Sequence, residues 1–116
     1  MTPADELHAA ADKLRTTARD AERESPSPWR LDRDVVRCND GGIVADASGE
    51  PNHAGDLPYI AAMHPGVGAA LADWLDAAAV HVRAGYVCCD NGAHRCYESA
   101  TPQALAVARQ ILGSQP

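Results

Sequence analysis

The sequence predicts an α+β fold in which a small antiparallel sheet is flanked by three main helices. Long stretches repeat apolar residues at helical spacing, whereas a central stretch places a glycine-containing turn between two β-prone runs. The length of 116 residues fits a single domain over 1–116. Because the chain has no phenylalanine and only 4% aromatic residues, we expect a core of alanine and aliphatic side chains.

The first element is an amphipathic helix over 3–24. Thr2 can cap this helix, and Pro3 fits its first position. Its apolar stripe consists of Leu7, Ala10, Ala11, Leu14, Ala18 and Ala21. The prolines of Ser25-Pro26-Ser27-Pro28 disfavour helical backbone in the residues before them, so the helix is predicted to end there.

A β-hairpin is predicted next, with strands over 29–37 and 42–47. The turn is indicated by Asn39-Asp40-Gly41-Gly42, because these residue types tolerate positive φ. Trp29 opens the first strand directly after the proline-rich linker. The segment 86–89 fits a third strand beside the hairpin.

A short helix is predicted over 57–63, with Asp56 as its N-cap. We expect Tyr59, Ile60 and Met63 to lie on one side of it. The helix should break at His64, which precedes a proline.

A long helix follows over 65–84, and the His64 imidazole can cap its start or hold a carbonyl. Its predicted buried stripe consists of Val67, Leu71, Trp74, Leu75, Ala78 and Val82. The last helix is predicted over 102–112, starting after Thr101 and stopped by Gly113.

The formal net charge of −6 argues against binding to nucleic-acid backbones, which attract Lys and Arg. It also permits the opposite role, in which the protein occupies a basic groove of a partner. No apolar run reaches the length of a membrane span, and the N-terminus lacks the features of a secretory signal. We therefore expect a cytoplasmic protein whose thiols stay reduced.

The segment 88–96 contains three of the four cysteines of the chain and one histidine. Its candidate zinc ligands are Cys88, Cys89, His94 and Cys96. Cys38 or His81 could complete a tetrahedral site. The spacing matches no standard zinc finger, so a structural zinc site is one interpretation. The other is that one cysteine is core, one is exposed and His94 is a polar turn residue. A disulfide from Cys88 or Cys89 to Cys96 has less support.

A cysteine-dependent enzyme has less support. Cys96 with His94, or Cys89 with His81 and Asp90, could be drawn as nucleophile and base. The sequence shows no nucleophile elbow and no glycine-rich phosphate loop.

Asp73 and Asp76 flank Trp74 on the predicted long helix. We expect these two carboxylates to face different ways, so they are not predicted to form an acid/base pair.

The segment from Asp56 to Val67, continued by Leu71-Ala72-Asp73-Trp74-Leu75, resembles a block in short actinobacterial and actinophage proteins and is similar to the Ead-like phage accessory family. The segment Ala104 to Gly113 is also similar to the actinobacterial group. The chain departs from the Ead-like pattern before Tyr59, where Leu57-Pro58 is inserted.

This resemblance implies a phage or prophage origin and an accessory role, and it carries over no catalytic residue. The leading interpretation is a protein that binds another macromolecule, with an unidentified protein partner. Alanine-rich helices would also suit a homodimer that buries one helix face from each chain. The alternative is a small module stabilised by zinc at 88–96.

Overall fold

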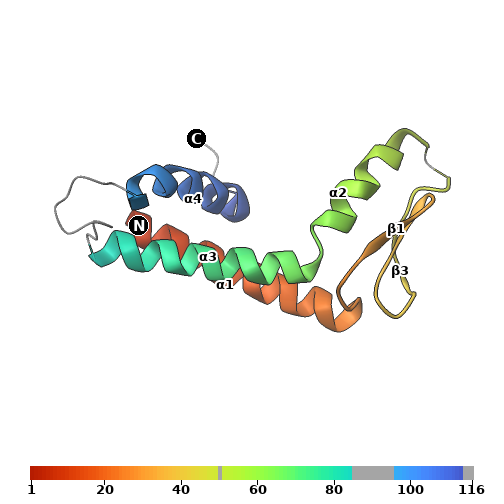
Figure 1. Cartoon of the computed structure of the whole chain (residues 1–116), viewed down its shortest axis with the longest axis horizontal. Helices are drawn as coiled ribbons and strands as arrows, with labels where there is room; N and C mark the ends of the chain where they lie inside the picture. The colour runs from red at the N-terminus through yellow and green to blue at the C-terminus, as the bar shows by residue number, and fades with distance from the viewer. Residues whose placement is uncertain (50, 85–95, 114–116) are drawn as a thin grey trace. The chain divides into compact units, whose positions relative to one another are not determined.

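The computed structural model describes residues 1–49, 51–84 and 96–113. Within them lie four α-helices, one 3₁₀ helix and a three-stranded antiparallel sheet, which confirms the predicted α+β class (Figure 1). The chain divides into two compact units. Unit 1 consists of Met1–Arg15 and Leu71–Pro116, and unit 2 consists of Thr16–Ala70.

Helix α1 spans Pro3–Glu24, the range that the sequence predicts. Thr2 caps it: the Thr2 hydroxyl accepts a hydrogen bond from the Asp5 N–H at 3.1 Å. The Asp5 carboxylate accepts one from the Thr2 N–H at 3.2 Å. This reciprocal arrangement satisfies N–H groups that have no partner inside the helix.

Unit 1 is built around segments of α1, α3 (Pro65–Ala84) and α4 (Cys96–Leu112). Its fully or almost fully buried residues are Ala4, Leu7, Ala10, Ala11, Ala72, Leu75, Ala79, Ala104 and Ala108. Alanine dominates because a methyl side chain lets helix backbones approach closely. The aliphatic side chains that complete this core come from all three helices.

Helix α4 begins before the position that the sequence predicts. Its start was expected at Thr101-Pro102, but Pro102 lies inside the helix. The segment 96–101 contains no glycine or proline, so nothing in it stops the helix from extending toward the N-terminus. The predicted third strand over 86–89 lies outside the described residues.

The sheet of unit 2 has the order β1-β2-β3, with β1 at Arg30–Asp32, β2 at Val35–Arg37 and β3 at Ile43–Asp46. The prediction of one continuous strand over 29–37 is wrong. The chain reverses between β1 and β2, where Asp32 pairs with Val35 and Arg33 has a φ of 60°. Arginine rarely adopts this left-handed conformation, so the sequence gives no turn signal here.

The turn at Asn39-Asp40-Gly41-Gly42, which joins β2 to β3, is confirmed. Gly41 has a φ of 93°, a conformation that glycine adopts without steric cost. The Cys38 N–H donates to the Gly42 carbonyl, and the Gly41 N–H donates to the Cys38 carbonyl, both at 2.9 Å. An irregularity between Val36 and Arg37 shifts the pairing register beside this turn.

Helix α2 spans Leu57–Ala62 and follows a 3₁₀ helix, η1, over Pro51–Asp56. The capping role predicted for Asp56 is wrong. Its φ and ψ of −75° and −26° are helical, because η1 runs directly into α2, and its side chain makes no cap hydrogen bond. In the core of unit 2, Leu57 packs with Val36 and Ala47.

Candidate functional site

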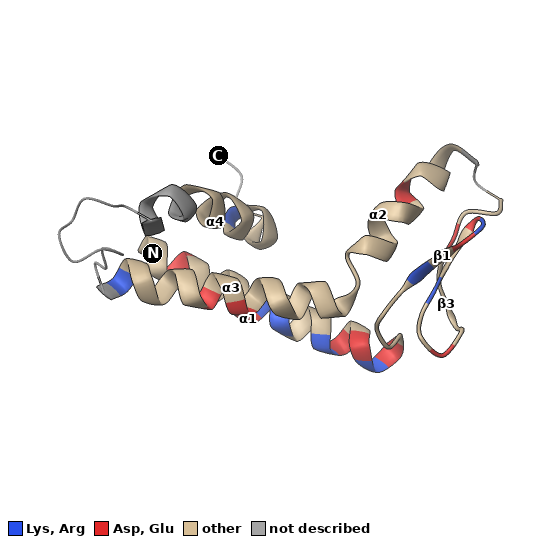
Figure 2. Ribbon diagram, viewed as in Figure 1, with Lys and Arg blue, Asp and Glu red and all other residues tan. Residues whose placement is uncertain are grey.

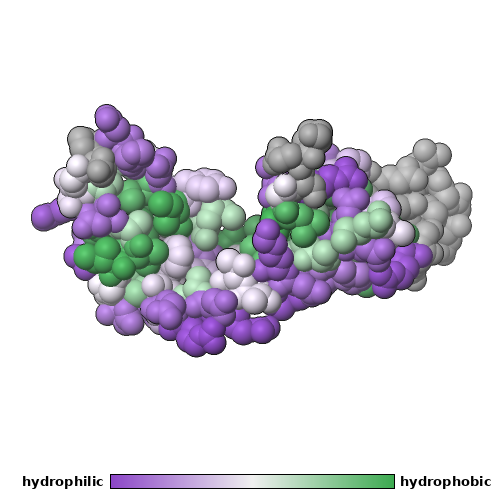
Figure 3. Space-filling model, turned by 180° about the vertical axis from the view of Figure 1, so that it is seen from behind, coloured by the Kyte–Doolittle hydropathy of each residue, from purple (hydrophilic) through white to green (hydrophobic). Residues whose placement is uncertain are grey.

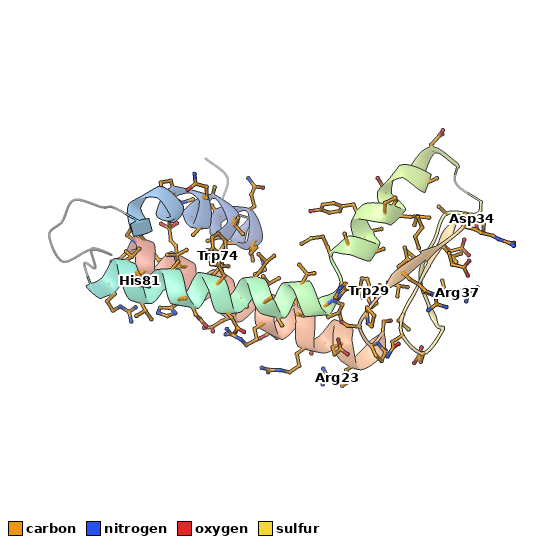
Figure 4. The ribbon with its side chains drawn as sticks, viewed as in Figure 1. Arg23, Trp29, Asp34, Arg37, Trp74 and His81 are labelled. Carbon is orange, nitrogen blue, oxygen red and sulfur yellow. The ribbon has the colours of Figure 1, made fainter. Side chains whose placement is uncertain are left out.

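Most of the predicted metal ligands cannot be placed. Cys88, Cys89 and His94 lie outside the described residues, and Cys96 opens α4 without a described side chain. Within the described part of the chain, no group of three or more His, Cys, Asp or Glu residues is arranged to hold a metal ion. His81 lies in the last turn of α3 (Figure 4).

Cys38, a predicted ligand whose side chain is described, belongs to the β2–β3 turn. It is 2% exposed, and its Sγ lies 2.8 Å from Asp40 Oδ1, to which the thiol donates a hydrogen bond. This bond and one from the Gly42 N–H lower the pKa of Asp40. A Cβ on Gly42 would lie only 3.3 Å from the sulfur, so the turn encloses the thiol closely. These contacts give Cys38 a structural role in the turn.

A hydrogen-bonded junction in unit 2 joins the end of α1 to the start of α3. The Ser27 hydroxyl donates to Glu22 Oε1 at 2.6 Å and accepts a hydrogen bond from the Gly66 N–H at 3.0 Å. The same N–H points at His64 Nδ1 at 3.1 Å, which confirms the capping role predicted for this imidazole. Hydrogen bonds from the Ser27 side chain and backbone lower the pKa of Glu22. The Ser27 hydroxyl thus donates its proton to the Glu22 carboxylate and accepts a hydrogen bond from the Gly66 amide. Both bonds hold backbone segments together, so we assign this junction a structural role.

An ion-pair network in unit 1 joins α1 to α3. One terminal nitrogen of Arg15 donates to Asp76 at 2.7 Å and to Asp73 at 3.2 Å. His8 Nδ1 lies 2.8 Å from the other oxygen of Asp76. Burial disfavours the Asp76 carboxylate, but hydrogen bonds from His8 and Arg15 outweigh burial and lower its pKa.

Because Asp73 and Asp76 contact the same guanidinium, the expectation that they face different ways is wrong. Residues three apart lie on one helix face. Both carboxylates are held by charge pairing, which stabilises packing between the helices of unit 1.

The predicted buried stripe of α3 is shifted. Ala72, Leu75 and Ala79 are fully buried, whereas Trp74 is 38% exposed (Figure 4). The apolar pattern placed Trp74 on the buried stripe, but Trp74 is not among the hydrophobic side chains that form the core of unit 1 or pack against it.

Helix α2 has two apolar faces, and only one of them is buried. Leu57, Ile60 and Ala61 pack into the core of unit 2. The opposite face is exposed and consists of Pro58, Tyr59, Ala62 and Met63, which we call the α2 surface. Tyr59 is 70% exposed and Met63 is 41% exposed.

The prediction that Tyr59, Ile60 and Met63 share one side of α2 is therefore wrong, because Ile60 packs inward while the other two face outward. The spacing of the α2 surface follows the helix, since positions four apart are neighbours on it. Leu31 and Ile43 add exposed apolar area elsewhere in unit 2, and Figure 3 shows hydrophobic side chains gathered on one face of this unit. The sequence does contain a signal for this exposed surface. The residues over 57–63 are apolar all around the helix, whereas one buried face needs apolar residues on one side only.

Comparisons with protein-family models, curated proteins and solved structures return no match. In the described ranges of the chain, no helix is both long and apolar enough to cross a bilayer. Among the described residues, the α2 surface is the strongest candidate site.

Proposed function

We propose that the chain is a phage- or prophage-type accessory protein that acts in the cytoplasm by binding another protein through the α2 surface. The observation that carries this proposal is the exposure of Tyr59 and Met63 on a helix whose other face is already packed. The family resemblance of the surrounding block supports an accessory role.

The α2 surface has the composition of a protein-binding site. Tyrosine and methionine are enriched at protein interfaces, where an aromatic ring supplies a large contact area with few rotatable bonds. A tyrosine buries about 150–250 Å² in a packed environment, at about 25 cal/mol per Å² of apolar area. With 70% of Tyr59 exposed, covering it would contribute roughly 2–4 kcal/mol before the cost of ordering.

This exposed area is not needed for the fold of unit 2. Leu57 reaches the core at 3% exposure, and Ile60 and Ala61 pack against the same cluster. Polar residues in place of Tyr59 and Met63 would leave those contacts intact. Because the fold does not require these two large side chains on the surface, we attribute their exposure to a partner that covers them.

The test compares the wild-type chain with a Tyr59→Asp, Met63→Asp variant as bait in lysate from the source cells. A Thr17→Asp, Arg19→Asp variant serves as control, because it adds aspartates at two exposed positions of unit 2 on α1. A protein retained by wild type is then purified, and its dissociation constant is measured for each bait.

We expect the α2 variant to weaken binding by more than about tenfold, as the loss of a hot spot does, while the control stays within about twofold. Circular dichroism should show that both variants remain folded. Equal binding by the α2 variant and wild type would contradict the proposal.

A further inference from the structure

The α2 surface lies within a long segment that has no basic side chain except histidine. Between residues 38 and 82 the sequence contains no Lys or Arg. The part of this segment that belongs to unit 2 carries acidic residues at positions 40, 46, 50 and 56. Figure 2 shows acidic colour just before α2 and no basic colour along it. The apolar face is thus presented in an acidic part of the chain.

The charge next to α2 is not neutralised by Arg30 or Arg37, the arginines within strands β1 and β2. Asp56 immediately precedes the helix, its side chain is 70% exposed, and its carboxylate lies 3.6 Å from the His53 imidazole. Arg37 is held by Asp32 at 2.8 Å and by the Gly41 carbonyl at 2.9 Å. Arg30 donates to the Cys38 carbonyl at 3.4 Å. In the described part of unit 2, no arginine forms an ion pair with Asp56, so its exposed carboxylate is accessible to a partner.

We infer that the occupant of the α2 surface is a protein segment that carries Lys or Arg beside an apolar anchor. This inference rests on the proposed function and adds the chemistry of the partner. The apolar anchor would cover Met63 and the Tyr59 ring, whose face can also attract a cation. A basic side chain next to the anchor would pair with Asp56, and complementary charge would speed association and select the partner.

The same charges disfavour other occupants. A second copy of the chain would bring like charges together, since the net charge is −6. Nucleic acids and anionic lipid surfaces repel an acidic protein for the same reason. A basic protein segment is the class that both the apolar and the charged features fit.

The test selects peptides from a random-sequence display library on the immobilised full chain. Peptides that also bind the Tyr59→Asp, Met63→Asp variant are discarded, so the surviving pool depends on the α2 surface. The net charge of this pool is compared with that of the unselected library. One enriched peptide is then synthesised, and its dissociation constant is measured at increasing salt concentration.

We expect the surviving pool to be enriched in Lys and Arg and its affinity to fall as salt increases. Asp56→Asn should weaken the synthetic peptide by roughly two- to fivefold, as expected for one exposed charge pair. Asp12→Asn, the same charge change in unit 1, should leave its affinity unchanged.

A surviving pool with neutral or acidic peptides would overturn the inference and leave the proposed function standing. The absence of any peptide that requires Tyr59 and Met63 would overturn both.

Discussion

Gly66 is the residue whose replacement most sharply tests the junction between α1 and α3. A Cβ at this position would lie 2.8 Å from Cε1 and 3.1 Å from Nδ1 of His64. Real Cβ atoms essentially never come within 3.0 Å of such a neighbour, so Gly66→Ala should push the imidazole aside. The ring would then lose its position over the Gly66 N–H, which it caps at 3.1 Å.

The size of the effect follows from two opposing changes. Replacing glycine by alanine in a compatible helical position stabilises by about 0.4–1 kcal/mol. Loss of a side-chain cap costs about 0.5–2 kcal/mol. In a His64→Ala background the cap is already absent, so Gly66→Ala should stabilise there. We therefore expect its effect on the free energy of unfolding to differ by about 0.5–2 kcal/mol between the two backgrounds.

The assay is a double-mutant cycle by urea unfolding, followed by the fluorescence of Trp29. The chain has two tryptophans, and a Trp74→Phe background leaves only Trp29, which lies in unit 2. Gly55→Ala serves as a matched control, because a Cβ there meets no atom within 4 Å. If Gly66→Ala has the same effect in both backgrounds, within about 0.5 kcal/mol, the assigned imidazole position is refuted.

Four further results are expected. Leu75→Ala should cost about 2–5 kcal/mol in urea unfolding, because the side chain is fully buried, whereas Val80→Ala, at 57% exposure, should stay within about 0.5 kcal/mol. Arg33→Gly should raise stability by up to about 1 kcal/mol, because glycine adopts the observed φ of 60° without steric cost; a loss of stability would contradict this turn. Asp76 has a lowered pKa in the folded chain, so it should stabilise above its ordinary pKa of 3.8 and lose this contribution as pH falls through the folded-state value. Acid titration by circular dichroism should show this loss in wild type and not in Asp76→Asn. If the zinc interpretation is right, elemental analysis of protein purified without a metal-affinity tag should find about one zinc per chain; no zinc and freely titrating thiols would contradict it.

The features that could be predicted from the sequence are those that depend on neighbouring residues. The limits of α1 follow from Thr2 at one end and from the prolines after Glu24 at the other. The β2–β3 turn follows from Gly41, whose positive φ few other residues adopt. The capping role of His64 follows from its place before a helix-starting proline. In each case the physical cause lies within a few residues in the chain.

The features that could not be predicted depend on tertiary packing. The reversal between β1 and β2 places Arg33 in a conformation that its residue type disfavours, so the pairing of the strands has to stabilise it. On α3, the buried positions are Ala72, Leu75 and Ala79, and Trp74 stays outside this core although it is a large apolar residue. A pattern of hydrophobic residues cannot separate these outcomes, because it records polarity and not available space.

On the α2 surface, the failure of the hydrophobic pattern to separate buried from exposed residues points to a binding site. Leu57, Ile60 and Ala61 pack into the core of unit 2, yet Tyr59 and Met63 also present large apolar area, and theirs is exposed. The sequence pattern assigned Tyr59, Ile60 and Met63 to one side because apolar residues are expected in a core. When a helix carries more apolar side chains than its fold can bury, the excess marks the surface that a partner can cover. The wrong assignment on α2 and the proposed binding surface therefore have one physical origin.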